Sequence, residues 1–296
     1  MNAPPPRTLV SQAQLNQPRG RILYRVVLTL VVVVFTLVFI GPLYFLFSDG
    51  LKSTTEAVQV PPTIIPAHVH LSTYSAAWSR VGLARLLVNT LYYAFGALFF
   101  QLIFDVAAAY SLSRLRPFGG RIIFALMLAT LMIPSTVLLV PQYVTVADLP
   151  ILHLNLIGSP EAIWLPSVAN AFNIFLLKRF FDSIPTDLLA AAAIDGASPL
   201  RTLRSVVLPI SRPILGVVSI FALVAVWKDF LWPLLVEYGY NPSRETLNVG
   251  IYEASSTTPQ NLVLAASAMA AVPTVIFFLI FQRNILAGLT AGSLKG

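Results

Sequence analysis

One stretch decides the fold of this chain: Ile184-Pro185-Thr186-Asp187-Leu188-Leu189-Ala190-Ala191-Ala192-Ala193-Ile194-Asp195-Gly196-Ala197-Ser198. Pro185 suits the start of a helix, and Thr186 or Asp187 can cap it. The four consecutive alanines have the highest helix propensity of any residue. Gly196 then ends the helix, because glycine tolerates the positive φ that a helix terminus often requires. The pattern predicts a short helix closed by a tight turn.

A second short helix is predicted directly after this turn. Leu200, Leu203 and Val207 recur at the i, i+3 and i+7 positions of one helix face. Arg201 and Arg204 form a basic stripe beside that face. Residues 184–213 are therefore predicted to form a helix-turn-helix segment, basic and partly apolar, between more hydrophobic runs.

The composition places the chain in a lipid bilayer. Of its 296 residues, 57% are hydrophobic and only 10% are charged, whereas soluble domains carry about 25% charged residues. The net charge of +7 is scattered among apolar runs and does not gather on one soluble face, so nucleic-acid binding is not expected. The chain has no cysteine, which excludes disulfides, thiolate catalysis and cysteine metal ligands.

Six apolar runs are long enough to cross a membrane, which favours an all-α integral membrane protein. The first run follows three arginines, as in a signal peptide, but it is too long and lacks a small-residue cleavage site. Pro134 and Pro141 interrupt the third run and predict kinks. The predicted spans are Val26–Ser48, Leu86–Tyr110, Ile122–Val146, Ile163–Phe181, Pro213–Val236 and Leu262–Gln282.

The basic residues predict the orientation of these spans. Arginine and lysine concentrate in cytoplasmic loops of membrane proteins. Of the 19 basic residues, 14 lie in segments that this rule assigns to the cytoplasm, and only Lys52, Arg80, Arg85 and Arg244 lie in the outer segments. Both termini are therefore predicted to be cytoplasmic. The 184–213 segment, between the fourth and fifth spans, is predicted to be cytoplasmic as well.

Charged residues inside the spans are functional candidates, because a charge at membrane depth is costly and normally faces protein or a water-filled cavity. Lys228 and Asp229 lie in the fifth span, within Trp227-Lys228-Asp229-Phe230-Leu231-Trp232-Pro233-Leu234. One interpretation is that Trp227, Lys228, Asp229, Phe230 and Trp232 line a translocation path suited to a sugar. The other is that the two charges neutralise one another or serve structure alone.

Asp105 is the third intramembrane charge, in the second span. It can pair with Lys228, pair with a residue of a partner subunit, or remain unpaired if the span ends earlier. Tyr110 and Arg114, at the cytoplasmic end of the same span, are predicted to be an interfacial aromatic and a snorkelling arginine.

The 184–213 segment resembles the EAA loop of the inner-membrane permease subunits of ABC importers, and its surroundings resemble the carbohydrate-uptake, maltose-type branch. The Ile-Pro-x-acid-Leu start, the Ala-Ala-x-Ile-Asp-Gly-Ala core and the Leu-Pro-x-x-x-Pro end are all present. Ala190 stands where the family has glutamate. The fifth-span octet resembles the family's Trp-Asn-acid-Phe-x-x-Pro-Leu signature, with Lys228 replacing asparagine, and residues 282–296 resemble the C-terminal ending of sugar permeases.

This resemblance implies a MetI-like permease fold with six transmembrane helices and a cytoplasmic EAA-type coupling helix between helices 4 and 5. Residues 1–21 would be a cytoplasmic tail and residues 22–296 the transmembrane domain, with a coupling loop at 182–213. In the family this loop sits in a groove of the ATPase subunit. The residues that the resemblance assigns to this contact are Leu188, Ala190, Ala191, Ala192, Asp195 and Gly196.

The resemblance also implies partners and a location. The chain would pair with a second, homologous permease in a bacterial inner membrane, in contact with membrane lipid. It would bind two ATPase subunits and receive a mono- or oligosaccharide or polyol from an extracytoplasmic binding protein. ATP and Mg would be used by the ATPases, and no cofactor would be bound by this chain. A non-sugar solute, such as a phosphorus compound or peptide, is the alternative.

Enzyme activity is not expected from the sequence, and no catalytic residue is assigned. No lysine follows a glycine as a phosphate-binding Gly-Lys-Ser/Thr loop requires, so the chain is not the ATPase itself. It has neither a Gly-x-Ser-x-Gly elbow nor a His-Glu-x-x-His helix. His68 and His70 lack a nearby third ligand in the sequence, so no metal site is predicted. A membrane enzyme without a local motif, or a scaffold, remains the different-class alternative.

Overall fold

The computed structural model describes residues 17–291, with the side chains of 281 and 283–291 left out. The described chain is helical, and its only β-type pairing is one isolated bridge between Leu149 and Leu154. The helices in chain order are α2 (Pro18–Asp49), α3 (Thr54–Ala57), α4 (Ser72–Arg80), α5 (Leu83–Tyr110), α6 (Gly120–Thr130), α7 (Ser135–Ala147), α8 (Glu161–Ser167), α9 (Ala171–Ser183), α10 (Thr186–Ile194), α11 (Pro199–Thr202), α12 (Leu208–Ile210), α13 (Arg212–Lys228), α14 (Leu231–Val236), α15 (Leu247–Ala254) and α16 (Gln260–Ala291). Two π-helical turns, η1 (Ser111–Leu115) and η2 (Leu203–Val207), extend α5 and join α11 to α12.

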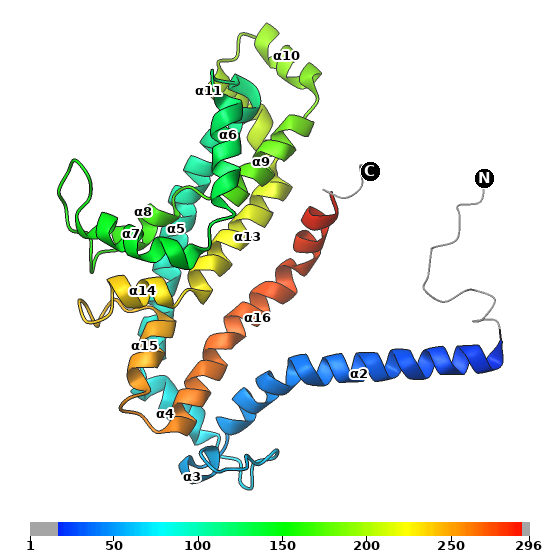
Figure 1. Ribbon diagram of the computed structural model, residues 1–296, viewed down its shortest axis with the longest axis vertical. Helices are drawn as coiled ribbons and strands as arrows, with labels where there is room; N and C mark the ends of the chain where they lie inside the picture. The colour runs from blue at the N-terminus through cyan, green and yellow to red at the C-terminus, as the bar shows by residue number, and fades with distance from the viewer. Residues whose placement is uncertain (1–16, 292–296) are drawn as a thin grey trace.

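α5 is the central helix of the body. It packs along α13 and α9, and its outer half also contacts α8, α15 and α4 (Figure 1). Its buried face includes Leu86, Tyr93, Ala97 and Ala109. Gly96 permits a close approach, since a Cβ atom there would lie 2.3 Å from the Trp164 ring. This packing confirms the predicted second span as a helix and makes it the element that positions the others.

α2 leaves the body of the molecule and extends to one side (Figure 1). It is 32 residues long and touches α16 only near its C-terminal end, and the side chains along most of its length are exposed. Because these exposed side chains are apolar and do not pack against their own chain, we expect lipid or another membrane protein to surround most of α2. The first predicted span is confirmed as helix. The helix begins at Pro18, so residues 18–21 of the predicted tail are helical, and residues 1–16 lie outside the described residues.

The third predicted span is not one helix. α6 and α7 are bent by 108° at residues 131–134. Pro134 occupies the position before α7, where it ends the preceding helical path because proline lacks an N–H and restricts the residue before it. Pro141 stays inside α7. The predicted interruption at Pro134 is confirmed, whereas α7 continues through Pro141.

The fourth and fifth predicted spans are also broken. α8 and α9 are separated at residues 168–170, where the Asn170 side chain caps α9 by accepting a hydrogen bond from the Asn173 N–H at 3.1 Å. α13 ends at Lys228, and α14 begins again at Leu231. Continuous helices were expected in both places. These breaks could not be read from the apolar composition. A helix can be interrupted inside an apolar run when polar side chains of the folded protein bond to the free backbone groups.

The number of membrane crossings is only partly fixed by these helices. Within residues 17–291, α2, α5 with η1, and residues 260–280 of α16 are long and apolar enough to cross a bilayer. Counting each bent pair as one span, α6 with α7 and the 199–210 helix with α13, brings the number to five. The sixth predicted span is confirmed as the helix α16. The count of six crossings stays a prediction.

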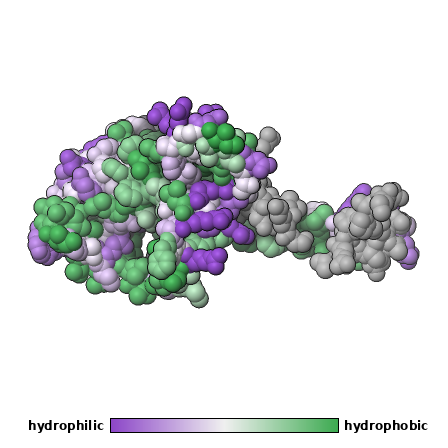
Figure 2. All heavy atoms as spheres, turned by 90° about the horizontal axis from the view of Figure 1, so that it is seen from above, coloured by the Kyte–Doolittle hydropathy of each residue, from purple (hydrophilic) through white to green (hydrophobic). Residues whose placement is uncertain are grey.

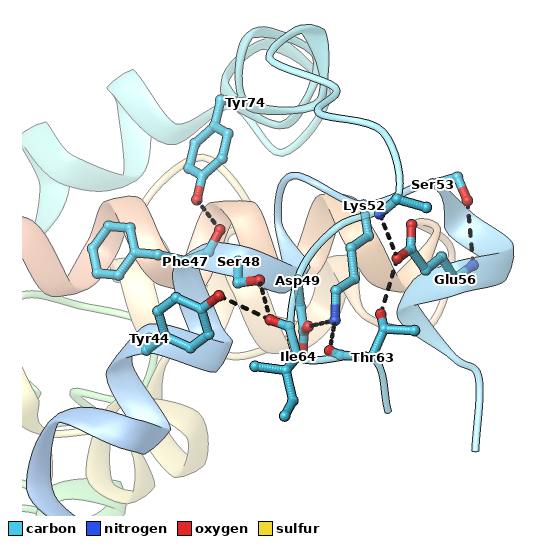
Figure 3. Close-up of polar contacts among 11 residues, drawn as sticks. Tyr44, Phe47, Ser48, Asp49, Lys52, Ser53, Glu56, Thr63, Ile64 and Tyr74 are labelled. Carbon is cyan, nitrogen blue, oxygen red and sulfur yellow. Dashed lines mark hydrogen bonds and ion pairs between the residues drawn. The ribbon is translucent and has the colours of Figure 1, made fainter. Parts of the chain in front are cut away.

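A polar cluster fastens the end of α2 to the segment that follows it (Figure 3). The Lys52 ammonium is 1% exposed, pairs with the Asp49 carboxylate at 2.5 Å and donates to the Thr63 carbonyl at 2.6 Å. Glu56 accepts from the Thr63 hydroxyl and from the Ala67 N–H, both at 2.9 Å. The backbone N–H of Ala67 is the main cause of the lowered pKa of Glu56. This cluster gives the predicted outer segment an ordered structure.

Candidate functional site

The sequence 184–198 forms the predicted short helix and turn. Helix α10 ends in a Schellman motif. The Gly196 N–H donates to the Ala193 carbonyl at 3.0 Å, and the Ala197 N–H donates to the Ala192 carbonyl at 2.9 Å. Gly196 has φ +70°, the left-handed conformation expected for it. Pro185 itself occupies the N-cap position without a side-chain bond, so the predicted capping by Thr186 or Asp187 is wrong.

The second predicted helix is also present. Ser198 caps it by accepting a hydrogen bond from the Arg201 N–H at 3.4 Å. The helix continues through α11, η2 and α12 and turns by 83° into α13 at Ser211. The segment therefore forms the helix-turn-helix at one end of the molecule, with α10 and α11 at the top of Figure 1. We call residues 182–213 the coupling loop.

The coupling loop has an inner and an outer face. Leu189 and Val207 pack into the core that Leu177 and Phe181 of α9 share with α5. Large apolar side chains remain uncovered on the outer face, with Leu188 45%, Ile194 86% and Leu200 73% exposed. Figure 2, which looks onto this end of the molecule, shows hydrophobic and hydrophilic residues mixed across it.

The six residues assigned to the ATPase contact divide between these faces. Leu188, Ala190, Ala191, Asp195 and Gly196 are exposed. Ala192 is 9% exposed and lies on the inner face of α10. The arrangement therefore offers five of the six residues to a partner protein and uses Ala192 within the chain. Their contact with an ATPase stays a prediction.

The C-terminal end of α5 and the η1 turn that extends it hold both ends of the coupling loop. The Arg114 guanidinium donates to the Phe181 carbonyl and, at 2.9 Å, to the Ile184 carbonyl, just before α10. The Tyr110 hydroxyl donates to the Pro199 carbonyl at 3.0 Å, at the start of α11. We call Tyr110 and Arg114, with these three carbonyls, the loop clamp. The loop clamp therefore joins α5 and η1 to backbone atoms on both sides of α10.

The loop clamp corrects the sequence interpretation of Tyr110 and Arg114. They were expected to be an interfacial aromatic and a snorkelling arginine, but Tyr110 is 7% exposed and both bind protein carbonyls. Their neighbour Ser113 donates to the Asp182 carboxylate at 2.6 Å, and Lys178 pairs with the same carboxylate at 2.7 Å. In the sequence, the spacing Ala-Tyr-x-x-x-Arg was the only feature that singled out this pair of side chains. What the two side chains bind is shown by the fold.

The break between α13 and α14 separates the residues of the fifth-span octet. Trp227 and Trp232 are 7% and 6% exposed. The Trp232 indole N–H donates to the Ala162 carbonyl at 3.0 Å, which ties α14 to α8. Lys228 is exposed, whereas the Asp229 carboxylate accepts from the Trp232 N–H at 3.5 Å. No close ion pair joins Lys228 to Asp229 in the described part of the chain, but the two charges interact electrostatically. Both interpretations of the two charges therefore stay open.

A groove of about 560 Å³ lies on the Lys228 side of this break. Of the five predicted path residues, Trp227, Lys228 and Phe230 line it, while Asp229 and Trp232 line a separate cavity of about 230 Å³ between α7, α8, α13 and α14. Further lining residues that the sequence did not single out come from the outer loop and α16. They include Asn248, Tyr252, Ser255, Ser267 and Thr274.

Asn248 and Tyr252 shape this groove. The Asn248 amide donates to the Trp227 carbonyl at 3.1 Å and to the Asp229 carbonyl at 3.2 Å, which satisfies the backbone where α13 ends. The Phe230 and Tyr252 rings pack edge to face, with their centroids 5.4 Å apart. The residues were missed because they are brought to the octet by the tertiary fold, about 20 residues further along the chain.

Asp105 binds a backbone N–H group and not a basic side chain. It is fully buried, and its Oδ1 atom accepts a hydrogen bond from the Asn170 N–H at 2.9 Å, at the start of α9. It therefore stabilises the break between α8 and α9 from the neighbouring helix. The suggested pair with Lys228 does not form within the described residues, and the Asp105 Oδ2 atom has no protein partner there.

The described residues contain no group of three or more His, Asp or Glu side chains placed to hold a metal ion. His68 and His70 line a groove with Glu56 on the outer segment, but they do not form such a group. The C-terminal residues 292–296, part of the sugar-permease ending, lie outside the described residues.

Comparison with known proteins decides the family. The model of the family described as the binding-protein-dependent transport system inner membrane component matches residues 101–285. These residues contain the C-terminal part of α5, the coupling loop and all three helix breaks. The chain belongs to this family. It is thus an inner-membrane permease subunit of a binding-protein-dependent ABC importer, as the sequence resemblance implied.

The curated relatives cover almost the whole chain. The sulfoquinovosyl glycerol transport system permease protein SmoH of Agrobacterium fabrum is 34% identical over 86% of this chain and 88% of its own length. The melibiose/raffinose/stachyose import permease protein MelC of Bacillus subtilis is 30% identical over 86% of this chain and 91% of its own length. The sn-glycerol-3-phosphate transport system permease protein UgpE of Rhizobium meliloti is 30% identical over 88% and 94%.

A solved structure confirms the fold. A chain of a bacterial ABC transporter involved in the import of the acidic polysaccharide alginate superposes with a TM-score of 0.75, at 22% sequence identity. The match covers 90% of this chain and 98% of the other. The broken helices of this chain therefore belong to an architecture found in an experimental transporter.

Proposed function

We propose that this permease subunit translocates a sugar, either a mono- or oligosaccharide or a polyol derivative, that an extracytoplasmic binding protein delivers. The observation that carries the proposal is the joint presence of the family's coupling loop, exposed on its outer face, and an aromatic and polar groove at the α13–α14 break. Aromatic faces with a few converging polar groups suit a sugar ring. The names of SmoH and MelC support the same solute class.

Partner subunits complete the proposal. The exposed outer face of the coupling loop would bind an ATPase subunit, and two such subunits would serve a pair of permeases. The second, homologous permease and surrounding lipid would cover α2, whose side chains have no cover from their own chain. In this arrangement both termini and the coupling loop are cytoplasmic, as the distribution of basic residues predicts.

The loop clamp supplies the mechanical step. Closure of the ATPases on ATP would move the coupling loop, and the loop clamp on α5 would carry that movement to α9 and α13, which pack along α5. Rotation of these helices would open the path to the outside, and hydrolysis of ATP by the ATPases would reset it. The chain itself contributes no catalytic residue to that hydrolysis.

A phosphorylated polyol is the second candidate solute. The relatives named as sn-glycerol-3-phosphate permeases favour it, and they cover as much of this chain as the sugar permeases do. Both candidates use the same fold and the same coupling loop. They differ only in the solute that the groove and the binding protein accept.

The test of the proposed function begins with the assembly. The tagged chain is extracted in mild detergent, and the proteins that co-purify are identified and quantified by mass spectrometry. We expect one copy each of two permeases with two ATPase copies, and ATP hydrolysis that rises when the binding protein and its sugar are added. Recovery of this chain alone from intact membranes, or enzyme activity of the chain without ATPases, would contradict the proposal.

A further inference from the structure

The orientation predicted from the basic residues places the groove at the α13–α14 break toward the outer side of the membrane. α13 has 17 residues from Arg212 to Lys228 and rises about 25 Å at about 1.5 Å per residue. The hydrocarbon core is about 30 Å thick, so a helix that starts at its cytoplasmic boundary reaches the outer third at Lys228. The groove is closed by α15, which belongs to the predicted outer loop. It is therefore placed where a solute arriving from outside first meets this chain.

Lys228 brings a positive charge to this groove, where the neighbouring Asp229 interacts with it electrostatically but does not form a close ion pair with it within the described residues. Its side chain is exposed there, and within residues 17–291 no hydrogen bond or ion pair to its ammonium group is found. The adjacent Asp229 carboxylate is directed to the start of α14, where it accepts from the Trp232 N–H, and it lines the other cavity. No Asp or Glu is among the residues that line the Lys228 groove.

The rest of the lining suits a sugar ring. Phe230 and Tyr252 present aromatic faces, and Ser255, Ser267 and Thr274 add hydroxyl groups. The Ser255 and Ser267 hydroxyls donate to backbone carbonyls of their own helices, at 2.6 and 2.9 Å, so their oxygen atoms remain able to accept hydrogen bonds from a hydroxylated solute. Among the described residues that line the groove, the Lys228 ammonium is a strong donor for which no protein acceptor is found.

We propose that this groove binds an anionic sugar derivative, with the Lys228 ammonium paired to the acidic group of the solute and Phe230 and Tyr252 against its ring. This inference rests on the proposed function and names the solute class within it. A charge at membrane depth requires a partner or water. A carboxylate, sulfonate or phosphate supplies that partner when the solute enters, whereas a neutral sugar leaves the ammonium unpaired. The shared chemistry of these three groups is a compact oxyanion next to a hydroxylated ring.

The test uses the complete transporter, with its own second permease, ATPases and binding protein, reconstituted in vesicles. Uptake and ATP hydrolysis are measured with three matched pairs: glucose and glucuronate, galactose and galacturonate, and glycerol and sn-glycerol 3-phosphate. We expect stimulation by at least one anionic member and not by its neutral counterpart. The Lys228→Gln variant should lower uptake of that solute about tenfold or more, which corresponds to about 1.4 kcal/mol.

Matched variants separate charge from structure. Lys228→Arg keeps the positive charge and should keep most of the uptake. Arg80→Gln removes an exposed charge from the outer segment away from the groove and should leave uptake unchanged. Full assembly of the Lys228→Gln complex, shown by the unchanged subunit ratio, excludes a folding defect.

The outcomes distinguish this inference from the proposed function. Stimulation only by neutral sugars, or uptake of an anionic one that Lys228→Gln leaves unchanged, would overturn the inference and leave the sugar-permease function standing. Stimulation by none of the six solutes would overturn the inference for solutes of this size and leave an oligosaccharide as the solute of the proposed function. Equal loss of uptake in Lys228→Gln and Lys228→Arg would also overturn it, because charge would then not be the property that matters.

Discussion

The two ends of the transport machinery in this chain are built in opposite ways. At the coupling loop, the loop clamp satisfies backbone carbonyls on both sides of α10 and leaves an apolar face outside. At the α13–α14 break, Asn248 satisfies the backbone, and a charged side chain, Lys228, lines a groove without a hydrogen bond among the described residues. On the proposed function, the coupling loop would bind a protein partner that moves it, and the groove would bind a polar solute.

The largest effect is expected from Arg114→Met, which breaks the loop clamp. The charged hydrogen bonds to the Phe181 and Ile184 carbonyls are worth about 1.5–3 kcal/mol each. When they are lost, the Phe181 carbonyl keeps the Ile184 N–H as a donor, whereas the Ile184 carbonyl loses its bond to the guanidinium. We expect ATP hydrolysis in the reconstituted transporter to continue while uptake falls by about tenfold or more, because one kcal/mol or two already changes an equilibrium by that order.

Arg116→Met is the matched control for the loop clamp. Arg116 lies two residues further on and is exposed, and its guanidinium reaches only the Ser113 carbonyl at 3.3 Å within its own turn. Its loss should leave uptake per ATP hydrolysed close to the wild-type value. If Arg114→Met also kept the wild-type ratio, the loop clamp would not transmit movement.

A smaller effect is expected from Gly196→Val in the same loop. A Cβ atom at Gly196 would meet no atom within 4 Å, so the cost is not a clash. It comes from φ +70°, which costs a residue other than glycine about 1–2 kcal/mol, and more for a β-branched one. We expect the turn to shift, uptake to fall several-fold relative to ATP hydrolysis, and membrane insertion to remain intact.

Gly216→Ala controls for the loss of a glycine. Gly216 lies inside α13 with nothing within 4 Å of an added Cβ atom, and its φ is not in the left-handed region. Alanine should be tolerated there and stabilise the helix by up to about 1 kcal/mol. Unchanged coupling in Gly196→Val, measured in the same vesicles, would show that the geometry of this turn does not matter.

The smallest effect concerns pH at the outer loop. Burial is the main cause that raises the pKa of Glu237 and of Glu245 to about 7, from 4.5. The Tyr93 hydroxyl and Arg244 oppose the shift at Glu237, and Glu161 adds to it. Glu253 and Glu237 add to the shift at Glu245, and Arg85 opposes it.

The sign of the pH effect follows from these raised pKa values. The protonated carboxyls favour the folded loop below about pH 4.5, and this contribution is lost as the pH rises to about 7. We expect backbone amides of residues 237–246 in the intact complex to be several-fold better protected at pH 5.5 than at pH 8, after correction for intrinsic exchange. Glu237→Gln with Glu245→Gln should remove the difference. Equal protection of the wild type at both pH values would contradict the account.

The sequence was sufficient for what is local. The Ala190–Ala193 run and Gly196 predicted α10 and its turn, and apolar length predicted α2, α5 and α16, because propensity and hydrophobicity act residue by residue. Pro134 indicated the break between α6 and α7, but the α8–α9 and α13–α14 breaks were not predictable in this way. Asp105, for example, stabilises the α8–α9 break from another helix, 65 residues earlier in the chain.

Some of the candidate functional residues could be recognised from the sequence, and others only from the fold. Lys228 stood out as a charge inside an apolar run, and the exposed residues of α10 stood out through their motif. Tyr110 and Arg114 look like an ordinary membrane-interface pair until the fold brings the Phe181, Ile184 and Pro199 carbonyls to them. A hydrogen bond to a backbone carbonyl leaves no trace in the identity of the residue that accepts it, so such partners need a structure.

The central claim is that the outer face of α10 contacts the ATPase, and the absence of cysteine makes a direct measurement possible. Ala190→Cys places a single thiol on that exposed face, and Ile65→Cys, 73% exposed on the outer segment, is the control. With a short thiol-to-amine crosslinker in membranes holding the complete transporter, we expect Ala190→Cys to join this chain to the ATPase subunit and Ile65→Cys not to. An assembled complex in which Ala190→Cys gives no such product, or no more than Ile65→Cys, would contradict the account.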